Sequence, residues 1–234
     1  MEPVPETREV LDELVSQGDV EIGVTLLRMG RAAQQIVPQC VGLSLALLED
    51  GLTFTLVATT TEIAALDAIQ YLDGGPCVEA AHEAQVINVD RDDITAEQQW
   101  RLYAQATAAA GIASSLTLPV ERGGRVVGSI NLYAATSDAF EGHHEELGEA
   151  LGASALSAVA NADLSFSTRL EAVQAPARLA DQDDVDIALG IIAASQDVDI
   201  PTAQERLRQA AARAGITEGQ AARAVRQVFS SRSD

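Results

Sequence analysis

The chain has 234 residues, of which 15 are basic and 35 acidic, giving a formal net charge of −20. Every basic residue is an arginine, and hydrophobic residues make up 47% of the chain although aromatic residues make up only 3%. This composition excludes a disordered chain and requires a core of Ala, Leu, Val and Ile. Spread evenly, the negative charge would repel nucleic acids and anionic membranes.

The sequence contains no run of 18 apolar residues, so we expect no transmembrane helix. The acidic N-terminus lacks the hydrophobic stretch of a signal peptide. Two cysteines, Cys40 and Cys77, are too few for a disulfide framework and have no metal-ligand spacing. We therefore expect a cytoplasmic protein with no membrane partner, no metal site and no cofactor.

The first two thirds of the chain alternate between helical and strand patterns. In chain order we expect a helix over 20–37, strands 41–48 and 53–60, helices 62–70 and 77–83, strand 86–89, helix 95–110 capped by Thr95, strands 113–121 and 125–134, and a long helix from 141. Asp50-Gly51 and Gly123-Gly124 predict tight turns between paired strands. Strands joined by hairpins, with helices around them, predict an α+β fold with an antiparallel sheet flanked by helices.

The long helix carries an apolar stripe at near four-residue spacing, formed by Leu147, Leu151, Ala155, Val159 and Ala162. This stripe exceeds what a single sheet face needs. We therefore expect it to offer a surface on which a second copy of the chain could pack.

The last third of the chain is helical in pattern throughout. We predict an N-terminal helical segment over 1–19, a helical linker over 164–180 and an all-α domain over 181–234. Within that domain the helices run over 185–195, 201–214 and 217–229, and Thr217 with Gln220 has the spacing of a capping box. Three helices of this length make a small bundle that is marginal on its own.

Three segments of the first domain, GGPCVEA (74–80), SLTLPV (115–120) and GSINLY (128–133), occur in an order that resembles a GAF domain. The resemblance covers about residues 20–163 and is to the GAF domains of actinobacterial GAF–ANTAR proteins. It implies a domain that senses a small molecule or a protein signal.

Residues 181–234 resemble an ANTAR domain, a three-helix RNA-binding module of transcription antitermination regulators. The matching positions are Ala188, Gly190, Ala203, Leu207, Ala211, Ala222 and Val225. The family carries a lysine where this chain has Leu189, and a further basic residue near Thr217, so two positive charges that the family uses towards RNA are missing here. The resemblance implies binding of RNA hairpins by a homodimer.

The charge is unevenly distributed along the chain. Residues 1–180 have a net charge of −17, whereas residues 200–234 contain six arginines and three acids and are net positive. Arginine neutralises phosphates and stacks on exposed bases. The candidate RNA contacts are therefore the helix arginines Arg206, Arg208, Arg213, Arg223 and Arg226, although all five also fit ordinary solvated helix positions.

Other side chains have a structural interpretation beside a functional one. Cys77, after a Gly-Gly-Pro turn, could line a ligand pocket, but a buried structural cysteine is commoner. Trp100 and Tyr103 fit a core or interface better than a stacking platform, and the pair His143-His144 fits a solvated helix start. An acidic loop of Asp90, Asp92 and Asp93 fits solvation better than cation binding.

No phosphate-binding loop, nucleophile elbow or zinc-helix motif occurs, so we expect no enzyme activity. The expected function is that of a signal-responsive RNA-binding regulator of transcription antitermination. The alternative is a GAF-type sensing and dimerisation protein whose ANTAR-like domain has lost RNA binding and acts as a protein-interaction module. Leu189 favours this alternative, and the clustering of arginines in the last 35 residues opposes it.

Overall fold

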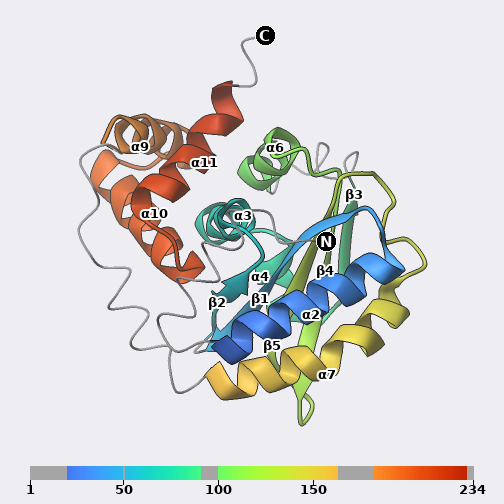
Figure 1. Ribbon diagram of the computed structural model, residues 1–234. Helices are drawn as coiled ribbons and strands as arrows, with labels where there is room; N and C mark the ends of the chain where they lie inside the picture. Colours follow the sequence, from blue (N-terminus) through green and yellow to red (C-terminus); the bar gives the residue numbers. More distant parts are fainter. Residues whose placement is uncertain (1–19, 50, 91–99, 163–181, 231–234) are drawn as a thin grey trace.

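The computed structural model describes residues 20–49, 51–90, 100–162 and 182–230 (Figure 1). Five strands form one antiparallel sheet in the order β2-β1-β5-β4-β3. Their bounds are β1 (Cys40–Glu49), β2 (Leu52–Ala58), β3 (Ile87–Asp90), β4 (Ser114–Arg122) and β5 (Arg125–Ala134). The predicted α+β fold with an antiparallel sheet is thus confirmed, and we call residues 20–162 the sheet domain.

The turn between β4 and β5 follows directly from its two glycines. Gly123 and Gly124 have φ angles of 61° and 76°, which are the positive values that a type I′ hairpin turn requires at both central residues. Arg122 and Arg125 pair across this turn, so the predicted tight turn at Gly123-Gly124 is present, and β4 extends one residue beyond its predicted end.

One face of the sheet is apolar and lies under α2 (Val20–Ile36) and α7 (His144–Ala162). Alternate residues of the central strands point to this side, so they form one buried cluster with both helices: Leu43, Leu45, Leu116, Leu118, Ile130 and Leu132.

The apolar stripe of α7 packs against the sheet and α2 of the same chain. Leu147, Leu151 and Ala155 are fully buried and Val159 is 4% exposed, all in the cluster with the sheet and α2. The expectation that these residues offer a surface to a second copy is therefore wrong, because the sheet domain already covers them. The side chain of Ala162 lies outside the part that the structure describes.

The opposite face of the sheet is covered by α3 (Thr61–Asp73), α4 (Pro76–Glu83) and α6 (Arg101–Ala109). The cap of α3 is Thr60, whose hydroxyl accepts a hydrogen bond from the backbone N–H of Ile63. Helix α6 begins at Arg101, later than predicted, and the expected cap Thr95 lies outside the described residues.

Three C-terminal helices follow, α9 (Gln182–Gln196), α10 (Ile200–Ala214) and α11 (Glu218–Ser230), which we call the helical bundle. Asp199 caps α10 by accepting a hydrogen bond from the N–H of Thr202 at 2.9 Å. The capping box of α11 is confirmed: the Thr217 hydroxyl accepts from the N–H of Gln220 at 3.2 Å, and the Gln220 amide oxygen accepts from the N–H of Thr217 at 2.8 Å.

The helical bundle shares a core with the sheet domain. Apolar residues of all three helices belong to one buried cluster with residues of α3 and α6: Val185, Ile192, Leu207, Ala222 and Val225 with Ile63, Leu66, Ile69 and Leu102. A bundle too small to be stable alone thus gains its missing apolar surface from α3.

Residues 1–19 and 164–180, predicted as a helical segment and a linker, lie outside the described residues. Within the described residues, no helix combines the length and the apolar character that crossing a membrane requires.

Candidate functional site: a buried polar cluster that contacts the helical bundle

The sheet face under α3 and α4 is lined with polar side chains. In β5, Ser129, Asn131 and Tyr133 occupy alternate positions and so point to the same side. Register places Ser44 of β1 and Thr117 of β4 beside Asn131, which continues the polar row across three strands. All five residues are at most 2% exposed, so their polar atoms need partners inside the protein.

Asp67 of α3 supplies the central acceptor of this cluster. Its carboxylate accepts hydrogen bonds from the Thr55 hydroxyl at 2.8 Å, the Tyr133 hydroxyl at 2.9 Å and the Asn131 amide at 3.3 Å. Gln70, one helical turn further along α3, adds a fourth at 3.5 Å. Asp67 is fully buried, and it forms no ion pair within the described residues.

Burial determines the ionisation of Asp67. Loss of hydration raises the pKa of its carboxyl to about 6, although the surrounding hydrogen bonds act in the opposite direction. Burial also raises the pKa of Tyr133 well above its ordinary value, so this hydroxyl stays protonated and donates to Asp67. The carboxyl therefore changes charge close to neutral pH, inside the core.

Cys77 closes one side of the polar cluster at the start of α4. It is fully buried, its backbone N–H donates to the Gln70 amide oxygen at 2.7 Å, and its Sγ lies 3.4 Å from the Ser129 hydroxyl. Burial raises the pKa of the thiol to about 12, which keeps it neutral and unreactive. Cys77 is thus a buried residue packed against Gln70 and Ser129. Its predicted role in lining a ligand pocket stays a prediction.

Gly75 allows this arrangement of Cys77 and Gln70. A Cβ atom at Gly75 would lie 2.6 Å from Cγ and 2.7 Å from Oε1 of Gln70. Only glycine therefore lets the Gln70 side chain lie against this turn. The glycine before Pro76 thus has a steric reason.

A chain of hydroxyl groups leads from Asp67 towards the helical bundle. The Thr55 hydroxyl has one proton, which it donates to Asp67, and it lies 2.9 Å from the Tyr71 hydroxyl. Tyr71 must therefore donate to Thr55. A change in the charge or contacts of Asp67 therefore changes the hydrogen bond between the Thr55 and Tyr71 hydroxyls.

Arg213 of α10 lies against the other side of Tyr71. Its guanidinium carbon is 4.3 Å from the centre of the Tyr71 ring, which is a cation–π contact. The same group donates to the backbone oxygen of Thr53 at 2.8 Å and to the Thr53 hydroxyl at 3.0 Å. Arg213, predicted to contact RNA, is thus half-buried against the sheet domain and holds α10 on β2 and α3.

A second polar contact joins the helical bundle to α3. Gln196, the last residue of α9, donates to the backbone oxygen of Leu72 at 3.0 Å and to the Asp73 carboxylate at 3.2 Å. Its own amide oxygen accepts a hydrogen bond from Arg206. Arg206 therefore supports the contact between bundle and sheet domain from the exposed side.

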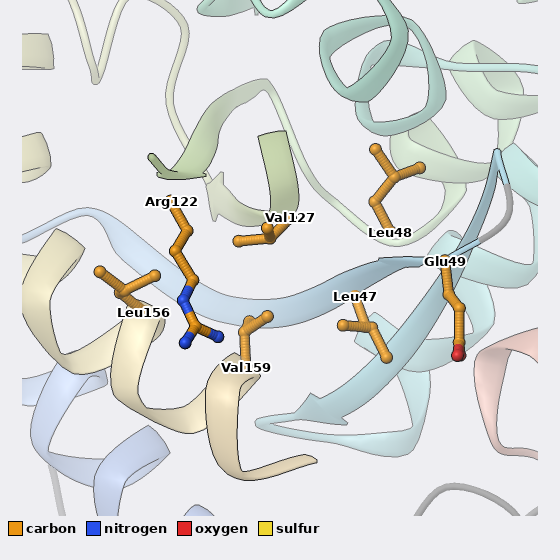
Figure 2. A pocket seen from close by; sticks show the side chains of 7 residues that line it. All are labelled: Leu47, Leu48, Glu49, Arg122, Val127, Leu156 and Val159. Atoms are coloured by element: carbon orange, nitrogen blue, oxygen red, sulfur yellow. The ribbon is translucent and has the colours of Figure 1, made fainter. Parts of the chain in front are cut away.

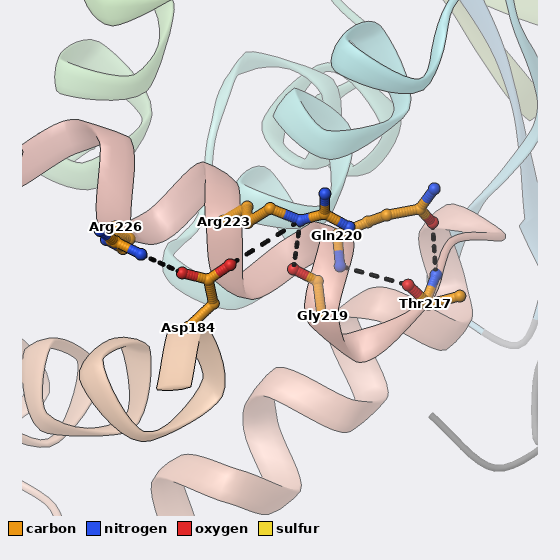
Figure 3. Close-up of polar contacts among 6 residues, drawn as sticks. All are labelled: Asp184, Thr217, Gly219, Gln220, Arg223 and Arg226. Carbon is orange, nitrogen blue, oxygen red and sulfur yellow. Dashed lines mark hydrogen bonds and ion pairs between the residues drawn. The ribbon is translucent and has the colours of Figure 1, made fainter. Parts of the chain in front are cut away.

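The remaining candidate arginines contact acidic residues on the bundle surface (Figure 3). Arg208 pairs with Glu205 on its own helix at 2.6 Å, while Arg223 and Arg226 both face Asp184 of α9. Gln196 and Asp184 lie at opposite ends of α9, about 18 Å apart along the helix axis. The five arginines thus have four different sets of partners and do not share one site.

The structure also places the aromatic and histidine side chains that the sequence singles out. Tyr103 is 1% exposed and donates to the Ser115 hydroxyl at 3.1 Å, and Trp100 is buried in the same core, as the core interpretation predicts. His143 lies 3.5 Å from Glu146. Asp92, Asp93 and the side chain of Asp90 lie outside the described residues, and in the described part no three His, Cys, Asp or Glu residues gather as a metal site.

A small pocket lies on the apolar side of the sheet, away from the polar cluster (Figure 2). Its volume is about 160 Å³, and its lining residues come from β1, β4, β5 and α7: Leu47, Leu48, Glu49, Arg122, Val127, Leu156 and Val159. A pocket of this volume accepts only a few atoms, far fewer than a cofactor-sized ligand has.

Sequence reasoning missed Asp67, the centre of the cluster. The signal was present: Asp67 is the single acid in the otherwise apolar stretch IAALDAI, and Ser129, Asn131 and Tyr133 alternate in β5. An acid on the buried face of a helix above a polar strand face predicts such a cluster.

Comparison with known proteins gives one family match. The sequence profile of the GAF domain family matches residues 7–160, which is more than half of the chain. No curated protein matches the sequence.

Several solved structures are similar to part of the chain at low identity. A domain of a putative two-component sensor histidine kinase from Sinorhizobium meliloti is 16% identical, with a TM-score of 0.44 over 62% of this chain and 95% of its own. The type II free methionine-R-sulfoxide reductase of Thermoplasma acidophilum is 16% identical, with a TM-score of 0.42 over 60% and 94% of the two chains. The protein fRMsr of Staphylococcus aureus in complex with its substrate is 14% identical, with a TM-score of 0.41 over 68% of this chain and 99% of its own.

Proposed function

Because the chain belongs to the GAF domain family, whose members sense signals, we propose that it is a signal-responsive regulator with the helical bundle as its output. In this proposal the sheet domain receives a small molecule or protein signal. The helical bundle, which resembles an ANTAR domain, contacts structured RNA and acts in transcription antitermination.

One observation carries the coupling between the two parts. Arg213 rests on Tyr71, and Tyr71 is joined through Thr55 to the buried Asp67 carboxylate. A signal that changes the charge or the partners of Asp67 therefore alters the surface on which α10 is held. Weakening the contact between Arg213 and Tyr71 would let the helical bundle separate from the sheet domain, while strengthening it would keep the bundle against the sheet domain.

The RNA contact rests on charge and exposure. Residues 200–234 are net positive in a strongly acidic chain, and Arg206, Arg208, Arg223 and Arg226 are exposed. Such a contact is local and weakens steeply with salt, because the rest of the molecule repels RNA.

Recovery of bound RNA from cells that produce the protein tests this proposal. The tagged full chain is crosslinked, and the RNA that it retains is sequenced. Arg208→Gln is the informative variant because the hydrogen-bonded partner of Arg208 is Glu205 on the same helix and the further charge that it faces, Glu218, also lies in the helical bundle. Its loss therefore leaves the contact with the sheet domain intact. Arg125→Gln, an exposed arginine of the β4–β5 hairpin, is the control with the same charge change.

We expect the wild type and Arg125→Gln to retain a common set of RNA hairpins, and Arg208→Gln to retain about three- to tenfold less of it. Equal retention by the two variants would remove Arg208 from the contact. Recovery of no RNA by any of the three chains would contradict the RNA proposal itself.

A specific observation favours the second candidate, a protein-interaction module that does not bind RNA. Leu189, at the position where ANTAR domains carry a lysine, is 6% exposed and belongs to the core shared with α3 and α6. In this chain the position therefore contributes apolar packing and no charge. Absence of RNA together with recovery of one defined protein partner in the same experiment would favour this function.

The proposal also includes a homodimer, which the ANTAR resemblance implies. Light scattering on the full chain measures its mass directly. A mass of about twice 24.5 kDa is expected, and a concentration-independent mass of 24.5 kDa would exclude a dimer in the free protein.

A further inference from the structure

Two arginines of the helical bundle share one acidic partner. Arg223 and Arg226 are three residues apart on α11 and so lie on one face of the helix. The Asp184 carboxylate of α9 lies between them, with one oxygen bonded to Arg226 and the other 3.9 Å from Nε of Arg223 (Figure 3). The arginine side chains are 52% and 50% exposed, whereas that of Asp184 is 15% exposed.

This arrangement is one that binds phosphate. Guanidinium groups bind carboxylates and phosphates through the same charge-assisted hydrogen bonds, and two of them converging on one anion add their charges. A phosphodiester of RNA carries one negative charge on two free oxygens, which is also the charge and oxygen count of the Asp184 carboxylate. The carboxylate therefore occupies the position in which such a phosphate would satisfy both arginines.

The ion pairs of Asp184 are not what holds α9 against α11. Buried apolar residues of the two helices, among them Val185, Ile192 and Val225, belong to the same core cluster. Ion pairs of half-exposed arginines contribute little to stability and are screened by salt. Asp184 can therefore lose its partners without separating the helices.

Together these contacts point to regulation of the RNA contact within the helical bundle. We propose that Arg223 and Arg226 form a binding site for a phosphate of the RNA backbone, and that Asp184 occupies this site as an internal competitor. This inference rests on the proposed RNA-binding function. It adds a phosphate-binding site and an aspartate of the same chain that inhibits it. RNA binds weakly while Asp184 stays in place, and a change that moves the start of α9 withdraws the competing carboxylate from both arginines.

The test compares two substitutions one residue apart. Asp184→Asn removes the competing charge and keeps the shape of the side chain. Asp183→Asn makes the same change in net charge in the same first turn of α9, but Asp183 is exposed and has no partner within the described residues. Both substitutions also remove an equal favourable interaction with the helix N-terminus.

The probe is a pool of synthetic RNA hairpins with randomised loops, and its binding to the full chain is measured by filter retention at several salt concentrations. We expect Asp184→Asn to bind about fivefold more tightly than the wild type, because an ion pair no longer competes. The slope of log affinity against log salt should steepen by about 0.7 to 0.9, the value of one further phosphate. Asp183→Asn should change affinity less than about twofold and leave the slope unchanged.

A third variant identifies the site. Adding Arg223→Gln and Arg226→Gln to Asp184→Asn should remove both the gain in affinity and the change in slope. An equal gain for Asp183→Asn and Asp184→Asn, or a gain that survives loss of both arginines, would overturn the inference and leave the proposed RNA binding standing.

Failure of the proposed function gives a different result. If no form of the protein retains the hairpins, the proposed RNA binding is refuted, and inorganic tripolyphosphate then tests the anion site by the NMR signals of the arginine Nε groups. Shifts of Arg223 and Arg226 in Asp184→Asn but not in the wild type would support the internal competitor. Absence of these shifts would overturn it.

Discussion

The two faces of the sheet are both buried but differ in chemistry. Under α2 and α7 the strands present leucine and isoleucine, and the helices complete a purely apolar core. Under α3 and α4 the same strands present Ser44, Asn131 and Tyr133, which surround a carboxylate. The first face provides stability, whereas the second contains a group whose charge can change, and only the second lies under α3, which contacts the bundle.

The largest effect should come from the apolar face. Leu132→Ala truncates a fully buried side chain of the central strand β5. The resulting cavity should lower the free energy of unfolding by about 4 kcal/mol. Urea denaturation measures this directly. A loss below about 1 kcal/mol would show that this face is not the main source of stability.

The polar face should respond to pH instead. Because the pKa of Asp67 rises from 3.8 to about 6 on folding, the folded protein binds a proton that the unfolded chain releases between these values. The contribution of Asp67 to stability is therefore fully present below pH 4 and is lost as the pH rises through 6. This loss should amount to about 3 kcal/mol.

Asp67→Asn removes this titration and keeps the shape of the side chain. The difference in unfolding free energy between wild type and variant should change by the same amount between pH 4 and pH 7. A difference that does not depend on pH would show that Asp67 stays ionised throughout.

A smaller effect is expected where the polar face meets the helical bundle. Arg213→Ala removes two hydrogen bonds to Thr53 and the contact with Tyr71, at a cost of about 2 kcal/mol. Hydrogen exchange should become faster in α10 while the central strands stay protected. Arg213→Lys should recover little, since lysine lacks the planar fork that reaches Thr53. Unchanged exchange in α10 would mean that the apolar core alone holds the bundle.

The smallest effect is expected on the outer surface of the bundle. Arg208 is exposed and its partner Glu205 lies on the same helix, so Arg208→Gln should leave the thermal midpoint unchanged. A clear drop in the midpoint would show that Arg208 has a structural role, and its loss of RNA retention could then not be assigned to RNA contact.

Features that depend on neighbours in sequence could be predicted. The Gly123-Gly124 hairpin and the Thr217–Gln220 capping box follow from local backbone chemistry, and both are present. The alternation of helices and strands in the sheet domain likewise reflects local periodicity, and the structure confirms it.

Features that depend on distant partners could not be predicted. Spacing places Arg213 on a helix face, but its partners Thr53 and Tyr71 are 160 and 142 residues away. Spacing also puts Arg223 and Arg226 on one face, whereas their shared partner Asp184 comes from another helix, 42 residues before Arg226. The same applies to the α7 stripe, because the sheet and α2 that cover it are assembled from distant segments.

The central claim is that the buried carboxylate and the helical bundle are energetically linked through Tyr71 and Arg213. A double-mutant cycle of Asp67→Asn and Arg213→Ala, measured by urea denaturation at pH 7.5, tests this link, and the pair Asp67→Asn and Arg208→Gln is its control. The account predicts a coupling energy of about 1 kcal/mol for the first pair and additivity for the second. Additivity within about 0.5 kcal/mol for the first pair would contradict it.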